Sequence, residues 1–337
     1  MMSPRLLFLL LSFSSVVVAT STTSNRGGYK FEASPAMKVE LAVWIICTIF
    51  FLLEAILCLI ALSRVKGRRL TYFLFLVSQL LLLSRSITGI IFIFIENNIY
   101  ATEPPVNALL LCDAIIDICK RVGQAFLFMA TVYLILDRHE AIDYAAGGRI
   151  GHIDSRMPLV HYALFMGSIA LGIVTAIFSE RYDSRLWKGY FDLHPKDQAK
   201  ENTHVQNLSY AYQGFSDSAG LYVLFFIAIT YAAMVRMNVN DKVMKFLLFI
   251  LAPFQACAVI INVLFSILFS PIGPKYAQTS IGNLQYSTAN TALFNVCLLG
   301  IGMAILLPGL LRTNWNLKGE SQSSVPLQRM RKGLVSG

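Results

Sequence analysis

The sequence contains little charge for its length. Only 14% of its 337 residues are Asp, Glu, Lys or Arg, whereas 56% are hydrophobic. An ordinary soluble domain is charged at roughly a quarter of its positions, because its surface faces water. The shortage of charge therefore argues against a water-soluble enzyme or binding module and predicts a protein that crosses a membrane several times.

Residues for metal or covalent catalysis are also scarce. Of five histidines, only His161 falls in an apolar segment long enough to cross a bilayer, so no cluster of zinc ligands is predicted. The chain has no Gly-rich phosphate loop and no GxSxG motif. The last apolar segment has no lysine, which argues against retinal bound as a Schiff base. We therefore expect no enzymatic activity, no cofactor and no metal site.

The cysteines do not form a disulfide framework. All six lie inside or at the edge of apolar segments, where they are expected to pack against other side chains. They are Cys47, Cys58, Cys112, Cys119, Cys257 and Cys297.

The net charge of +9 does not indicate nucleic acid binding, because the basic residues sit in short clusters beside apolar segments. The predicted partner is the lipid bilayer. No internal repeat is evident, so a transporter built from inverted repeats is not supported.

The N-terminus resembles a secretory signal. Arg5 is followed by an apolar core over residues 6–18, and small residues end at Ala19. We predict a signal peptide at 1–19 that is cleaved after Ala19, with an uncleaved anchor as the alternative. Residues 20–40 would then form a short extracellular tail.

Seven apolar runs of spanning length follow the tail. They cover residues 41–62, 71–95, 108–136, 159–179, 210–235, 244–269 and 286–311. The sequence therefore predicts an all-α polytopic membrane protein, with a seven-helix transmembrane domain at 41–311.

Charge in the connecting loops predicts the orientation of the seven helices. Lys and Arg concentrate in loops 63–70, 137–158 and 236–243 and in the tail 312–337, which are predicted to be cytoplasmic. The N-terminus would lie outside, at the plasma membrane after passage through the secretory pathway. The longest predicted loop, 180–209, contains a candidate N-glycosylation site at Asn207.

Several charged residues interrupt the apolar runs. At helical spacing, those of the third run fall on one face, and two more from the second and fifth runs reach a similar depth. We predict that they form an outward-facing pocket for a small polar or zwitterionic ligand, the alternative being that they only fasten helices together. These residues are Asp113, Asp117, Lys120, Arg121, Arg85 and Asp217.

Two further features lie in the apolar runs. Glu54 is expected to pair with Arg85, or alternatively to carry a proton. Pro253 is expected to kink the sixth run and could serve as a hinge.

The end of the third run resembles a family motif. Asp137-Arg138-His139 is similar to the Asp-Arg-Tyr motif of rhodopsin-like G-protein-coupled receptors in residue type, helix and membrane side. The resemblance implies that Asp137 holds Arg138 at rest and that Arg138 is released toward a cytoplasmic signalling partner. The seventh run lacks Asn-Pro-x-x-Tyr, and Arg85 stands where an acid would be expected. Cys112 also has no cysteine in 180–209 with which to pair.

A second resemblance concerns the second run. Leu83-Ser-Arg85-Ser-Ile-Thr-Gly89 looks like the second helix of seven-helix membrane proteins of filamentous fungi, which implies no activity.

Three functions are compatible with these features. The first is a receptor-like protein that senses a small polar ligand, and the second is a transporter or channel that uses the same charges. The third is a non-catalytic scaffold or trafficking protein. A continuous polar route through the inner half, which the sequence mostly lacks, would favour transport.

Overall fold

The structure, a computed structural model, describes residues 35–65, 69–99, 106–148, 157–187, 195–269 and 280–311. These residues are helical apart from short turns, and no strand occurs among them. The predicted signal peptide at 1–19 and the predicted tail at 312–337 lie outside the described residues.

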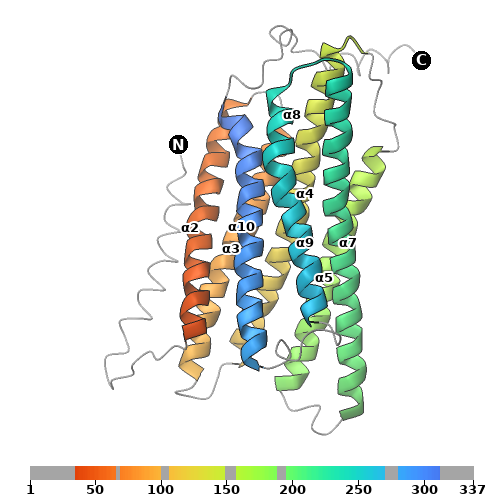
Figure 1. The fold of residues 1–337 in the computed structure, drawn as a ribbon. Coiled ribbons are helices and arrows are strands. Elements are labelled where there is room, and N and C mark those ends of the chain that lie inside the picture. The colour runs from red at the N-terminus through yellow and green to blue at the C-terminus, as the bar shows by residue number, and fades with distance from the viewer. Residues whose placement is uncertain are drawn as a thin grey trace, which may run out of the picture. The chain divides into compact units, whose positions relative to one another are not determined.

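Long apolar helices account for almost all of the described chain (Figure 1). Their bounds are α2 Pro35–Arg64, α3 Arg69–Ile99, α4 Val106–Ala145, α5 Met157–Trp187, α7 Pro195–Arg236, α8 Lys242–Phe246, η1 Leu247–Leu251, α9 Ala252–Phe269 and α10 Ser280–Leu310. Within the described ranges, seven segments are long and apolar enough to cross a membrane, the sixth being α8, η1 and α9 together. This confirms the predicted set of seven apolar helices and indicates an integral membrane protein.

The helices pack as neighbours in a closed order. Helix α2 contacts α3, followed by α4, α5, α7, α9 and α10, and α10 returns to α2. Helix α4 also contacts α7, α8 and α10, so it is packed on more sides than its neighbours. Its position allows α4 to link sites at different depths of the bundle.

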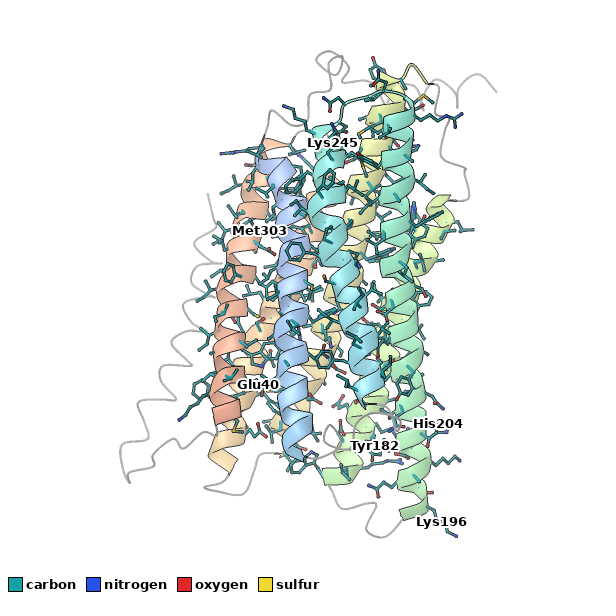
Figure 2. The ribbon with its side chains drawn as sticks, viewed as in Figure 1. Glu40, Tyr182, Lys196, His204, Lys245 and Met303 are labelled. Atoms are coloured by element: carbon teal, nitrogen blue, oxygen red, sulfur yellow. The ribbon has the colours of Figure 1, made fainter. Side chains whose placement is uncertain are left out.

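Two ends of the bundle are distinguished below. Figure 2 shows Lys245 at one end, and Glu40, Tyr182 and Lys196 at the other. The end with Lys245 is called the Arg138 end, and the opposite end is called the Asp113 end, because these two residues of α4 lie toward them.

The outer surface of the bundle is apolar. Ile49, Leu159 and Phe249 expose between 60% and 72% of their side chains, although they belong to the predicted spans. Large exposed apolar surfaces are rare on soluble monomers, whereas lipid tails would cover them in a bilayer. The exposure pattern is thus the one expected of a membrane bundle.

The predicted loop at 180–209 is wrong for most of its length. Helix α5 continues to Trp187 and α7 begins at Pro195, so only the connection between them remains. In α7, residues 196–201 read Lys-Asp-Gln-Ala-Lys-Glu, most of which favour helix without being apolar. An ion pair between Arg185 and Glu201 joins the two extensions. Asn207 lies exposed within α7, and its glycosylation stays a prediction.

Two other predicted boundaries also shift. The predicted tail 20–40 overlaps α2, which begins at Pro35 and carries on into the first apolar run. The predicted loop 137–158 is shortened, because α4 extends to Ala145 before Gly147 and Gly148 adopt positive φ angles of 74°. The left-handed backbone at these glycines is a common way to end a helix.

A turn of π-helix precedes Pro253, the residue predicted to kink the sixth span. This turn, η1, covers Leu247–Leu251, and Ala252 separates it from Pro253. Proline lacks the N–H that would bond to the preceding turn, and its ring crowds the carbonyl four residues earlier. Widening to a π turn relieves this crowding, and such turns often occur near functional sites.

Close helix packing depends on glycine at the contact between α9 and α10. A Cβ built on Gly300 would lie 2.5 Å from the ring of Phe254, closer than real Cβ contacts occur. Gly214 on α7 offers a matched control, because a Cβ there meets nothing within 4 Å. Alanine substitutions at the two glycines therefore distinguish the effect of close packing on stability from the effect of helix propensity.

We expect Gly300→Ala to destabilise the protein by ~1 to 3 kcal/mol, because the Phe254 ring must move out of a packed position. Gly214→Ala should be neutral or stabilise by ~0.5 to 1 kcal/mol, because alanine favours helix. Thermal unfolding in detergent measures both. Equal effects of the two substitutions would contradict the packing of α9 against α10.

Candidate functional site

The charged face predicted on α4 contains one clear ion pair. Arg121 Nη2 lies 2.8 Å from Asp117 Oδ2, one helical turn away. The side chains are 12% and 31% exposed, so the pair is only partly shielded. Asp113, one turn farther toward its end of the bundle, is exposed. The predicted alignment of these residues along one helix is therefore consistent with a mouth at the Asp113 end.

Arg121 connects this pair to the next helix. Its guanidinium carbon lies 4.6 Å from the centre of the Tyr212 ring on α7. The Tyr212 hydroxyl donates a hydrogen bond of 3.2 Å to Gln124 Oε1, which brings the chain of contacts back to α4. Stacking and hydrogen bonding thus fix the relative rotation of α4 and α7.

Arg85 and Lys120 are neutralised less directly. Arg85 Nη1 donates to Asn295 Oδ1 at 2.9 Å, and its guanidinium carbon lies 4.9 Å from the Trp44 ring centre. The Lys120 ammonium lies 5.9 Å from the ring centre of Phe294. Aromatic faces and an amide oxygen therefore take the place of carboxylates around these two cations.

A small cavity lies deeper in the bundle, between α4, α7, α9 and α10. Its volume is about 60 Å³, which is room for a few water molecules. Its polar lining includes Gln124, Thr131, Ser216 and Asn262, and Asp217 is the only charged residue that lines it. The cavity therefore presents a negative group to whatever enters.

The six predicted pocket residues do not meet at one point. Only Asp217 lines the cavity, whereas Lys120 and Arg121 lie against the rings of Phe294 and Tyr212, which do line it. Arg85 is buried between α2, α3 and α10. The predicted cluster is thus divided into separate contacts, and its role in ligand binding stays a prediction.

Asp217 is held by its neighbours on α9. Asn262 Nδ2 donates to Asp217 Oδ1 at 3.1 Å. The main-chain carbonyl of Asn262 in turn accepts hydrogen bonds from Gln213 at 2.8 Å and from Ser266 at 3.0 Å. This cluster joins α7 to α9 and leaves the Asp217 carboxylate without an ion pair to any described Lys or Arg.

The predicted pairing of Glu54 with Arg85 is wrong. Both Glu54 carboxylate oxygens are buried without a hydrogen-bond partner, and the residue is 1% exposed. Arg85 instead reaches the level of Trp44, which is ~15 Å along α2 from Glu54. Glu54 points at Gly302 of α10, where any larger residue would collide with the carboxyl group.

Arg138 forms a buried ion pair that sequence analysis missed. Its Nη1 lies 3.5 Å from Oδ2 of Asp241, and the side chains are 0% and 1% exposed. The resemblance implied Asp137 as the resting partner of Arg138, and that pairing stays a prediction. The ion pair with Asp241 connects α4 to the start of α8.

Local sequence signals place Asp241. Asn238 adopts a left-handed φ of 55° and ends α7, with Val239 N–H donating to the Met234 carbonyl. Three residues later, Asp241 Oδ1 caps α8 by accepting from Val243 N at 2.7 Å and Met244 N at 3.2 Å. A helix-ending Asn followed by an N-capping Asp is detectable in the sequence.

Apolar side chains separate the cavity from this ion pair. Leu134 and Ile135 lie between Thr131 and Arg138 on α4 and are fully buried. Ile227, Met244, Leu247 and Leu251 belong to the same buried cluster. On α4, apolar packing thus separates the polar residues of the cavity from Arg138.

No protein-family model matches the chain, and no curated protein matches it either. The resemblances to G-protein-coupled receptors and to fungal seven-helix proteins stay predictions. The function is therefore inferred from the geometry of the site.

We expect Asp241→Asn to lower the free energy of unfolding by ~3 to 5 kcal/mol, because asparagine can still cap α8 but removes the carboxylate charge that faces the buried Arg138 guanidinium. Arg138→Met should cost a similar amount, and the double variant less than the sum. Glu201→Gln, which removes the partly exposed pair with Arg185, should cost only ~0 to 1 kcal/mol. Denaturant unfolding in mixed micelles gives these values, and strict additivity would show that Arg138 and Asp241 do not interact.

Glu54 is predicted to destabilise the protein. Glu54→Met keeps the shape of the side chain and removes a buried carboxyl without a partner, so it should raise stability by ~1 to 3 kcal/mol. Glu40→Met on the same helix should instead lower stability slightly, because Glu40 accepts a hydrogen bond from Trp44. The melting temperature is the readout, and a fall for Glu54→Met would mean that Glu54 makes a stabilising contact.

Proposed function

We propose that the protein is a receptor-like membrane protein. A small polar ligand or head group would bind at the cavity around Asp217, and the Arg138–Asp241 pair would respond at the other level of the bundle. The observation that carries the proposal is that both sites share α4, with Gln124 and Thr131 lining the cavity and Arg138 in the buried pair. Thr131 and Arg138 are ~10 Å apart along that helix.

The Arg138–Asp241 pair is suited to a switch between two states. A buried ion pair adds little net stability, but leaving one of its charges buried without the other is costly. A rearrangement that separates the pair must therefore give both residues a new environment. Asp241 begins a single short helical turn that leads into the π turn of η1. A shift of α4 or α7 is therefore most easily accommodated in this segment.

A transporter is the second candidate, and Glu54 is the observation that favours it. A buried acid without a partner is a common feature of proton pathways in membranes. Against it, the apolar cluster around Leu134, Ile135 and Leu247 interrupts a polar path between cavity and ion pair. The scaffold alternative has no residue that favours it over the others.

The orientation belongs to the same proposal. We place the Asp113 end outside and the Arg138 end in the cytoplasm of a plasma-membrane protein, as the loop charges predict. Arg138 would then face a cytoplasmic signalling partner when Asp241 releases it.

Cysteine accessibility in sealed proteoliposomes tests the proposal. Ser216→Cys places a thiol in the cavity wall, in a background where Cys119 and Cys257, the two native cysteines that are not buried, are replaced by Ser. A small cationic methanethiosulfonate reagent is added to either face. We expect reaction from the outer face alone, and a change in rate of at least about fivefold when Asp241→Asn breaks the distant pair.

The receptor and transporter candidates give different results. An Asp241→Asn protein whose cavity thiol reacts from the opposite face would be a transporter. An unchanged rate in Asp241→Asn would leave the two levels uncoupled and contradict the receptor proposal. Glu201→Gln is the matched control and should not alter the rate.

A further inference from the structure

A groove on the flank of α7 and α9 adjoins the cavity. It has a volume of about 310 Å³ and shares Asp217 with the cavity. The remaining lining residues are Tyr210, Gln213, Gly214, Val263, Ser266 and Ile267. Tyr210 and Ile267 are 46% and 54% exposed, so the groove is open on the apolar flank of the bundle. Asp217 therefore lies where a lipid-facing groove meets an interior cavity.

Two glycines on α7 show why the groove opens. At Gly220, a built Cβ would lie 2.7 Å from Val259 and 2.8 Å from Gln255, so α7 and α9 touch there. At Gly214, which is ~9 Å farther along the helix, a built Cβ meets nothing within 4 Å. Gly214, which lines the groove without a side chain, therefore leaves space open beside α9.

Several polar groups at the inner wall of the groove already use donors within the cluster. Asn262 and Ser266 already use donor groups within the cluster, and Gln213 donates its amide to the Asn262 carbonyl. Asp217 retains carboxylate acceptor capacity, and it forms no ion pair with a described Lys or Arg. A ligand group that donates several hydrogen bonds and carries positive charge complements this wall.

The volumes decide what kind of ligand fits. Drug-sized ligands occupy pockets of roughly 300 to 1,000 Å³, so the cavity of about 60 Å³ has room only for a head group. The groove is of the larger size and has apolar residues, Val263 and Ile267, on its open side. A head group at Asp217 and a hydrocarbon chain in the groove would use both spaces.

We propose that the site binds a single-chain amphiphile with a protonated amine, which enters from the bilayer between α7 and α9. Its ammonium group binds Asp217, and its chain lies along Tyr210, Val263 and Ile267. Arg121 and Lys120 line neither the cavity nor the groove, Arg121 is paired with Asp117, and both cations lie against aromatic rings. The inference names the ligand class of the proposed receptor and so rests on that function.

Photolabelling of the full chain in phosphatidylcholine nanodiscs tests the inference. The probe is dodecylamine with a diazirine in its chain, and peptide mapping locates the adducts. We expect adducts on α7 from Tyr210 to Asp217 and on α9 from Val263 to Ile267. Dodecylamine should compete at least about tenfold better than dodecanol or dodecanoate, because only the amine forms a charged hydrogen bond to Asp217.

Two variants remove the site in different ways. Asp217→Asn should reduce specific labelling about tenfold by removing the charge. Gly214→Phe should abolish it by filling the groove, without a fall in melting temperature, because the added side chain meets open space. Asp197→Asn, an exposed carboxylate near the start of the same helix, is the control and should label like the unmodified protein.

Uniform labelling of all lipid-facing helices would overturn the inference, as would equal competition by dodecanoate or full labelling of Asp217→Asn. Failure of the receptor proposal looks different. Site-specific labelling together with an unchanged thiol reaction rate in Asp241→Asn would retain the amphiphile site and reject signalling. Coupled thiol rates without site-specific labelling would retain signalling and reject the amphiphile.

Discussion

Charge buried in an apolar bundle must be compensated within the bundle, because lipid supplies neither ions nor hydrogen bonds. This requirement explains why the buried arginines have polar or aromatic partners. Arg138 is compensated by Asp241, Arg121 by Asp117 and the Tyr212 ring, and Arg85 by Asn295 and Trp44. Asp217 differs, since its described partners include an amide but no cation. Asp217 also borders both the cavity and the lateral groove.

Helix α4 connects the cavity to the Arg138–Asp241 pair. It contacts neighbours on several sides and carries the mouth, part of the cavity wall and Arg138 in turn. Packed interiors resist continuous deformation, so a change at the cavity is transmitted most readily as a rigid shift of such a helix. The short α8 segment and the π turn beyond it are the less regular elements against which α4 would move.

Hydropathy predicted seven apolar helices correctly, because burial in lipid imposes a length and composition on each span. It misjudged residues 195–209, which form helix through propensity and solvation without being apolar. The Arg85–Asn295 hydrogen bond was not predicted. Depth along the helices paired Glu54 with Arg85 wrongly, because side-chain direction is not contained in depth. Asp241 lies outside the predicted apolar runs, so the search for charges within those runs did not include it. Its capping signal was nevertheless present in the sequence.

The central claim is that the Asp217 site and the Arg138–Asp241 pair are thermodynamically coupled. Coupling is reciprocal, so a ligand that favours separation of the pair must bind more tightly when the pair is already broken. The most direct test compares the dissociation constant of dodecylamine for the unmodified protein and for Asp241→Asn, both in nanodiscs. The account predicts a constant lower by about 5- to 150-fold in Asp241→Asn. Equal constants for two folded proteins would contradict it.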